Sequence, residues 1–160
     1  MTEGIAIVPT DVRPGEARTV IYLSGTYDIF ISHCWRYDEE WTEMVALLDE
    51  ALGRSWRNWS LPWYDPGLDR FTPEGRAHLV DTLDGQLSMC GALLALADIC
   101  KGSRGNTWLA IQIEFAQKYG KPVYGVCRKS DGSFPEQFRS STERIVGWSA
   151  AEIVPLLKPI

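Results

Sequence analysis

Short apolar, β-rich runs alternate with segments of helical periodicity along most of this chain, and that alternation constrains the fold more than any other feature. The runs expected to form strands are 27–32, 59–63, 91–97, 122–126 and 145–147. Strict alternation with short links requires right-handed crossovers and a parallel sheet with helices on both faces. We therefore expect an α/β fold of three layers, with a central parallel sheet of five strands.

Cap residues mark the expected helices between these runs. Asp38 can cap a helix that runs to about Leu52, and Gly53 can close it in the left-handed conformation. Thr72-Pro73 combines a capping hydroxyl with proline at the first helical position, and this pair predicts a helix to about Met89.

Two further caps are expected in the second half of the chain. Asn106 is expected to cap a helix over Thr107–Tyr119 that Gly120 ends, and Glu136–Phe138 is expected to form a short helical turn. Ser149–Glu152 reads as a capping box that opens a last helix.

The first 26 residues are harder to interpret. Two apolar patches, Ile5–Val8 and Val20–Leu23, flank a turn-like Arg13-Pro14-Gly15. They fit either a hairpin or a loose extension, and we favour the hairpin. The expected organisation is therefore an N-terminal extension over 1–26 and one domain over 27–160.

Charge and composition exclude several classes of protein. Apolar residues make up 45% and charged residues 23%, which is typical of a globular domain. A net charge of -5 disfavours electrostatic binding to nucleic acid or to an anionic membrane. No apolar run is long enough to span a bilayer, and the start Met1-Thr2-Glu3-Gly4 lacks the pattern of a signal peptide. These features predict a cytoplasmic protein.

The cysteines predict buried thiols rather than a metal site or disulfides. They are scattered, without a C-x-x-C pair or a histidine at ligand spacing: Cys34, Cys90, Cys100 and Cys127. We expect reduced core thiols and no bound metal.

Ligands of such folds bind outside the carboxyl ends of the strands, which directs attention to the segments 32–38, 64–71, 98–106 and 127–133. No dinucleotide fingerprint, P-loop or nucleophile elbow is present, so a Rossmann dehydrogenase, a P-loop NTPase and an α/β-hydrolase are not expected. The first of these segments, Ser32–Asp38, contains His33, Trp35 and Arg36. It fits a ligand mouth and an ordinary polar loop equally well.

The tryptophan-rich stretch Ser55–Asp65 ends in Trp63, Tyr64 and Asp65. Most of its aromatic rings are expected to pack in the core or at the sheet edge. Trp63 or Tyr64 could instead stack on a planar ring such as nicotinamide or adenine.

Glu114 falls on the polar side of its expected helix. The apolar residues of Thr107–Tyr119 form one stripe, and Glu114 falls beside Ala110 and Gln117 on the remaining face. Periodicity alone therefore predicts a solvated glutamate that can pair with Lys118 at i+4.

Three blocks of sequence resemble TIR-like domains, in order and at matching spacing over about residues 27–127. The run 27–33 with Trp35 resembles the opening strand and first box of TIR domains. Residues 55–60 with Asp65-Pro66 are similar to the TIR-like branch typified by the sensor protein of Thoeris anti-phage defence. Trp108, the run 113–116 and the run 120–126 are similar to the third helix and fourth strand of that branch.

The resemblance implies a flavodoxin-like fold and cleavage of NAD⁺, with release of nicotinamide and formation of ADP-ribose or a cyclic or conjugated ADP-ribose messenger in antiviral defence. It implies that Glu114 is the catalytic residue of an NAD⁺ glycohydrolase or ADP-ribosyl cyclase and stabilises positive charge on the ribose. The implied substrate-binding residues are Ser32, His33, Trp35, Asp38, Trp63 and Asp65. NAD⁺ is then a substrate, and no separate cofactor is expected.

The same resemblance implies the partners of such an enzyme: NAD⁺, further copies of the chain on activation, a phage-derived trigger and an effector reached through a diffusible nucleotide. Two other functions stay open. One is a non-catalytic TIR-like module that signals by self-association, and the other is an enzyme like the nucleoside deoxyribosyltransferases, which use a carboxylate nucleophile.

Overall fold

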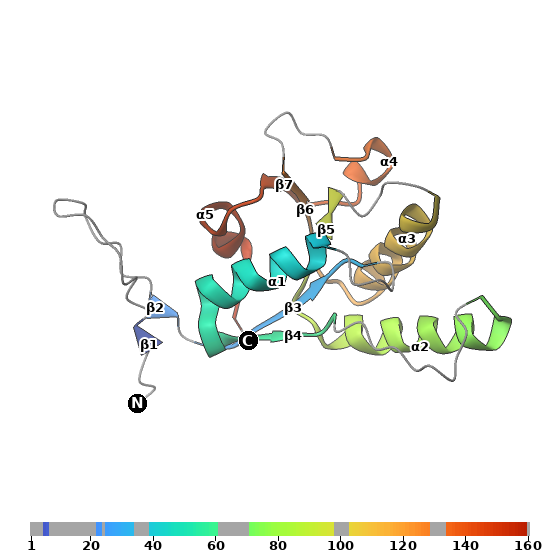
Figure 1. Cartoon of the computed structure of the whole chain (residues 1–160), viewed down its shortest axis with the longest axis horizontal. Coiled ribbons are helices and arrows are strands. Elements are labelled where there is room, and N and C mark those ends of the chain that lie inside the picture. The colour runs from blue at the N-terminus through green and yellow to red at the C-terminus, as the bar shows by residue number, and fades with distance from the viewer. Residues whose placement is uncertain are drawn as a thin grey trace.

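A central sheet of five parallel strands organises the computed structural model, which describes residues 5–6, 22–23, 25–33, 39–60, 71–97, 103–128 and 134–159 (Figure 1). The strand order is β4-β3-β5-β6-β7, and every neighbouring pair is parallel. The strands are β3 (Tyr27–Ile31), β4 (Trp56–Asn58), β5 (Ala92–Leu96), β6 (Val123–Cys127) and β7 (Arg144–Gly147). The expected three-layer α/β fold with a five-stranded parallel sheet is confirmed.

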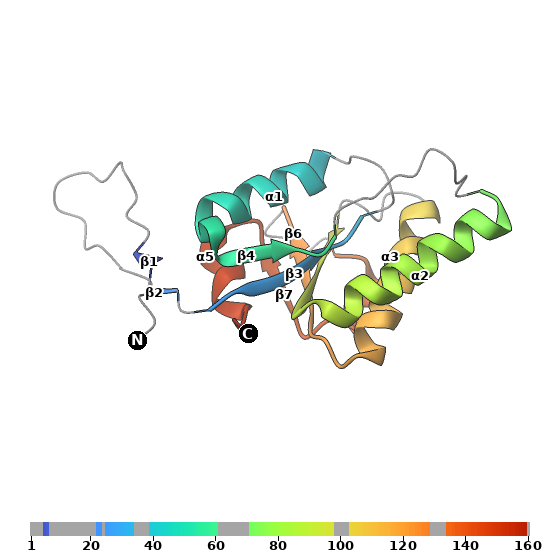
Figure 2. The same ribbon diagram turned by 90° about the horizontal axis from the view of Figure 1, so that it is seen from below.

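Helices cover both faces of this sheet. One face packs against α1 (Glu39–Leu52) and α5 (Ala150–Ile153), and the other against α2 (Pro73–Met89), α3 (Ser103–Lys118) and α4 (Glu136–Arg139). Figure 2 shows α1 on one side of the strands and α2 and α3 on the other. Two short 3₁₀ turns follow α1 and α5: η1 (Gly53–Ser55) and η3 (Val154–Leu156).

The strands β3, β5 and β6 are buried at every position, as runs covered on both faces should be. The two hydrophobic clusters lie on opposite faces of the sheet. Phe30 and Leu93 belong to the cluster under α2 and α3, whereas Ile31 and Leu94 belong to the cluster under α1. This alternation is the period of two that a strand imposes.

Several residues that mark helix ends in the sequence have the expected roles in the structure. The Thr72 hydroxyl accepts a hydrogen bond from the Gly75 amide at 3.1 Å, with Pro73 at the first helical position of α2. Gly53 and Gly120 adopt left-handed conformations, with φ of 56° and 63°, at the ends of α1 and α3. A side chain is strained at such φ values, so glycine is the favoured residue at both positions.

Two expected boundaries are wrong. The strand β4 covers Trp56–Asn58 and ends before Trp59, because Arg57 pairs across to Asp28 on β3. Residues 61–63 of the expected strand lie outside the described residues. The helix α3 begins at Ser103, so Asn106 lies inside the first turns and is not the cap. Cap and strand propensities are local, and a partner strand or a longer helix overrides them.

The last helix begins as expected, but its carboxylate has a different partner. Ser149 Oγ accepts a hydrogen bond from the Glu152 amide at 3.3 Å. The Glu152 carboxylate does not close the reciprocal half of a capping box and instead accepts from the Gly147 amide at 2.6 Å. It thereby ties α5 to the end of β7.

Near the N-terminus, β1 (Ile5–Ala6) pairs antiparallel with β2 (Tyr22–Leu23) in a separate two-stranded sheet. The remainder of the expected hairpin, including Arg13–Gly15, lies outside the described residues. Within the part of the chain that the structure describes, no helix combines the length and apolar character needed to cross a bilayer.

Candidate functional site

The strand order places a topological switch point at the carboxyl ends of β3 and β5. These strands are neighbours, but β3 continues into α1 on one face of the sheet and β5 into α3 on the other. Connections that leave a sheet on opposite faces leave an opening between them, and ligands of open α/β folds bind there. Ser32 and His33, which directly follow β3, lie at this edge.

Ser32 is fully buried and extends the pairing between β3 and β5 by its side chain. Its amide donates to the Leu94 carbonyl at 2.9 Å, and its Oγ accepts from the Leu96 amide at 2.8 Å. The hydroxyl thus replaces a backbone acceptor where the strand ends, and its own proton is available for donation. Ser32 therefore holds the two strand ends together at the opening.

His33 is also fully buried, and its ring lies against Phe30 with the centroids 5.6 Å apart and the planes 25° apart. Burial lowers the pKa of His33 to about 3, so the imidazole is neutral at physiological pH. A neutral imidazole offers one donor and one acceptor, and it brings no positive charge to the ends of β3 and β5.

Gln112 on α3 completes this group, and the sequence interpretation did not include it. Its side chain is fully buried, and its Nε2 donates to the His33 carbonyl at 2.6 Å. Its position in the helix could have predicted its burial. Gln112 lies three residues after Leu109 and four before Ala116, both of which are fully buried. We refer below to Ser32, His33 and Gln112 as the switch-point group.

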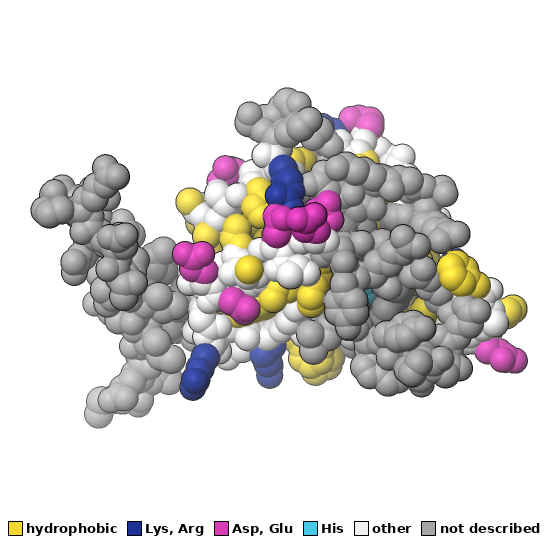
Figure 3. All heavy atoms as spheres, viewed as in Figure 1, with side chains coloured by type: hydrophobic (Ala, Val, Ile, Leu, Met, Phe, Trp, Pro, Cys, Tyr) yellow, Lys and Arg dark blue, Asp and Glu magenta, His cyan; other side chains and the backbone are white. Residues whose placement is uncertain are grey.

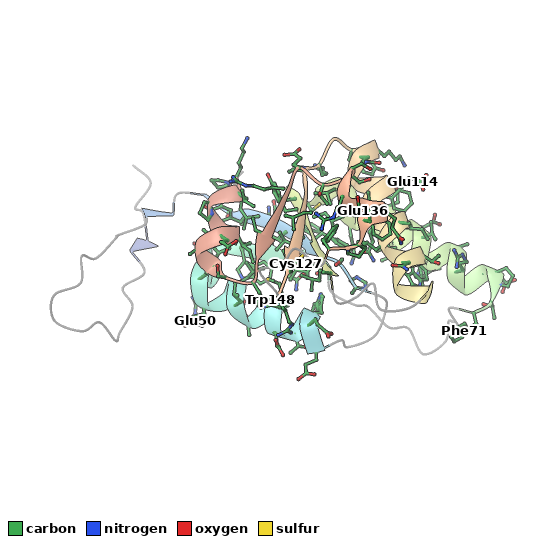
Figure 4. The ribbon with its side chains drawn as sticks, turned by 90° about the horizontal axis from the view of Figure 1, so that it is seen from above. Glu50, Phe71, Glu114, Cys127, Glu136 and Trp148 are labelled. Atoms are coloured by element: carbon green, nitrogen blue, oxygen red, sulfur yellow. The ribbon has the colours of Figure 1, made fainter. Side chains whose placement is uncertain are left out.

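Glu114 lies apart from this group. It is exposed, as its periodicity predicts, and Figure 4 labels it on the outer side of α3. Two residues along an α-helix correspond to a rotation of about 200°, so Glu114 and Gln112 face opposite sides of α3. Lys118 does not pair with Glu114 as expected: its Nζ donates to Asp84 on α2 at 2.8 Å.

The other candidate substrate-binding residues, Trp35, Asp38, Trp63 and Asp65, lie outside the described residues. Ser60, just after β4, is the last described residue before two of them, and it is buried. Its Oγ accepts from the Trp41 indole at 3.1 Å and donates to Asn58 Oδ1 at 2.6 Å. This relay joins the end of β4 to the start of α1.

A second polar cluster lies further along the same sheet edge, at the ends of β6 and β7. The Arg128 guanidinium lies 4.3 Å from the ring centroid of Trp148 and donates to Glu43 on α1 at 2.5 Å. Both charged side chains are partly exposed. Figure 3 shows acidic side chains along α1 on the viewed face, consistent with its five acidic residues, Glu39, Glu40, Glu43, Asp49 and Glu50. This cluster joins the ends of β6 and β7 to α1.

The described cysteines are buried thiols. Cys90 and Cys127 are both reduced, and burial raises the pKa of Cys90 to about 11. Cys34 and Cys100 lie outside the described residues. Among the residues that are described, no group of three or more histidine, cysteine or acidic side chains could hold a metal ion.

Comparison with known proteins assigns no family. No family model matches the chain. No curated protein matches it either. Among solved structures the chain is similar to the CMP N-glycosidase BcmB of Clostridium botulinum, at 11% identity and a TM-score of 0.46, over 75% of this chain and 87% of that one. A similarity this distant assigns no activity, so the functional argument depends on the residues themselves.

Proposed function

We propose that this chain is a TIR-like domain that binds NAD⁺ at the carboxyl edge of its sheet and cleaves the bond between ribose and nicotinamide. The observation that supports this most directly is the switch-point group. Three buried polar residues meet where the connections after β3 and β5 diverge. Buried polar side chains are costly to keep in an apolar core, and they gather at ligand sites more often than elsewhere.

The proposal retains the wider role that the resemblance implies. The product is ADP-ribose in linear, cyclic or conjugated form, which acts as a messenger in bacterial anti-phage defence. The chain works in the cytoplasm, assembles with further copies when a phage-derived trigger is present, and reaches its effector through the diffusible product. It uses neither a separate cofactor nor nucleic acid or membrane as a partner.

Glu114 is the reactive carboxylate in this proposal, and its position makes that assignment testable. Its role is to stabilise positive charge on the ribose as nicotinamide leaves. Because Glu114 faces away from Gln112, substrate at the switch-point group of the same chain would not meet its carboxylate. Within one chain, a catalytic Glu114 therefore requires NAD⁺ to reach the outer face of α3.

That position favours a second candidate function, a TIR-like module that signals by self-association without chemistry. The residue that α3 presents to the end of β3 is an amide, Gln112. An amide can bind a ligand, but it acts neither as a nucleophile nor as a general base.

Nicotinamide release separates the two candidates. The full chain is incubated with NAD⁺ both as purified and in extracts of cells challenged with phage, and nicotinamide is measured by chromatography. We expect Glu114→Gln to lower the rate by a factor of about 100 or more, as loss of an electrostatic stabiliser does. Glu50→Gln, at another exposed helix glutamate, should leave the rate unchanged.

Each other outcome has a definite meaning. Equal rates of nicotinamide release for Glu114→Gln and Glu50→Gln would support NAD⁺ cleavage and show that Glu114 is not the catalytic carboxylate. No nicotinamide release under either condition, together with an intact defence response in the Glu114→Gln variant, would replace the enzyme with the self-association module.

A further inference from the structure

The amide of Gln112 is oriented by the backbone. Its Nε2 lies 2.6 Å from the carbonyl oxygen of His33, which can only accept a hydrogen bond. The flipped amide would bring two oxygens together at that distance, so the donor side is assigned to His33. The acceptor Oε1 must therefore point to a different neighbour.

The structure describes no residue that donates to this oxygen. Oε1 of Gln112 is buried without a hydrogen-bond donor among the described residues, and the whole side chain is inaccessible to solvent. A buried acceptor that lacks a donor costs about 1–3 kcal/mol, and the great majority of buried polar atoms have a partner. A ligand that supplies the missing donor would remove this cost.

The surroundings of Gln112 restrict what that donor can be. The neighbouring core residues of α3, Leu109, Ile113 and Ala116, are apolar. The imidazole of His33, whose carbonyl Gln112 contacts, is neutral. A cation would have to lose its hydration here without an opposite charge among these residues, which is strongly unfavourable. A neutral N–H donor meets the requirement without that penalty.

We propose that Gln112 determines ligand specificity by accepting, through Oε1, a hydrogen bond from a neutral –NH₂ group on a planar heterocycle. This inference rests on the NAD⁺-binding part of the proposed function and deepens it, because the carboxamide of the nicotinamide ring in NAD⁺ carries such a group. It does not depend on Glu114, which faces the opposite side of α3. The inference also extends beyond the proposed function, because the exocyclic amine of a nucleobase offers the same donor.

Pairs of ligands that differ in this one group test the inference. The first pair is NAD⁺ and its 3-acetylpyridine analogue, in which a methyl group replaces the carboxamide –NH₂. The second pair is AMP and purine riboside 5′-monophosphate, which lacks the 6-amino group. Dissociation constants are measured by titration calorimetry, and KM is measured where the ligand is cleaved.

The variant Gln112→Met keeps the length of the side chain and removes both polar atoms. Its control is Gln117→Met, the same substitution on the exposed face of α3. Thermal unfolding of both variants establishes that they are folded. If Gln112→Met does not fold, the preference of the wild-type chain within each pair still tests the inference.

We expect the wild-type chain to bind the –NH₂ member of at least one pair about tenfold more tightly, the usual effect of one hydrogen bond. Gln112→Met should reduce that ratio to about one, and Gln117→Met should retain it. Equal binding of both members of each pair by the wild-type chain would overturn the inference, and so would an unchanged ratio in Gln112→Met.

Failure of the proposed function gives a different pattern. Cleavage of NAD⁺ without preference for the –NH₂ group retains the proposed function and overturns the role of Gln112. Preference for AMP without binding of NAD⁺ retains the role of Gln112 and overturns the proposed function. Binding of no member of either pair overturns both.

Discussion

Asp28 holds the edge strand β4 against β3, one of the two strands at the switch point. Its carboxylate is buried and accepts from Arg57 Nε at 2.5 Å, from a second Arg57 nitrogen at 2.7 Å and from the Trp59 indole at 2.9 Å. Asp28→Asn keeps the shape of the side chain but removes the charge and turns an N–H group toward the guanidinium. We predict a clear loss of stability for this variant.

The size of the loss follows from the exposure of the partners. A hydrogen bond to a charged group contributes about 1.5–3 kcal/mol. The Arg57 side chain is 60% exposed, so water can solvate the guanidinium once the carboxylate is gone, and this reduces the loss. The amide oxygen that Asp28→Asn introduces can still accept from the Trp59 indole. The expected decrease in the free energy of unfolding is therefore about 2 kcal/mol, or roughly 4–8 °C in Tm for a chain of this size.

The loss should also depend on pH. Burial of Asp28 alone would raise the pKa of this carboxyl, but the hydrogen bonds from Arg57 and Trp59 outweigh it and lower the pKa. The unfolded chain therefore takes up this proton first as the pH falls, and the contribution of Asp28 to stability is lost as the pH falls through the folded-state pKa. The difference between wild type and Asp28→Asn should be constant above about pH 5 and should shrink below about pH 4.

Urea unfolding monitored by tryptophan fluorescence measures both effects. The matched control is Asp49→Asn, since Asp49 also accepts from an indole, that of Trp56 at 3.0 Å, but on the exposed surface. We expect the control to change stability by about 0.5 kcal/mol or less. Equal losses for the two variants, or a loss for Asp28→Asn that does not vary between pH 7 and pH 3.5, would refute this account.

Two further predictions concern the core. In Gly125→Ala the new Cβ would lie 3.0 Å from ring carbons of Phe134 and 3.1 Å from Ile145. We expect this overpacking to lower the free energy of unfolding by about 1–3 kcal/mol, as measured in urea. An unchanged urea midpoint would contradict this prediction. Burial raises the pKa of Cys90 to about 11, so its thiol should resist iodoacetamide at pH 8 in the folded chain and react in urea. Peptide mapping by mass spectrometry measures the labelling. Rapid labelling of Cys90 in the native chain would contradict this prediction.

Much of the fold follows from short-range patterns. The buried strands 27–31, 92–96 and 123–127 appear where continuous apolar runs predict them. Thr72-Pro73 starts a helix, and Gly120 ends one, because the first supplies a capping acceptor and the second tolerates a positive φ. Such signals depend on neighbours within a few residues, so they can be recognised in one sequence.

The boundaries of β4 and α3 were less predictable. The alternation of Trp59, Leu61 and Trp63 suggested a strand, but the ladder of β3 pairs with residues 56–58. Pairing register depends on contacts such as Asp28 with Arg57, which are 29 positions apart. The strand propensity of a residue does not indicate which residue of the neighbouring strand pairs with it.

Some residues of the candidate site could likewise be predicted from the sequence, and one could not. The position of Ser32 and His33 at a strand end, and the exposed face of Glu114, could be read from periodicity, because strands and helices present side chains at regular intervals. The inclusion of Gln112 could not. Its amide contacts a backbone carbonyl 79 positions earlier, and only the crossing of α3 over the end of β3 brings the two together. Local sequence thus specifies which residues face inward. The packing of distant segments decides which of them meet at the ends of β3 and β5, because that outcome depends on contacts that no local pattern encodes.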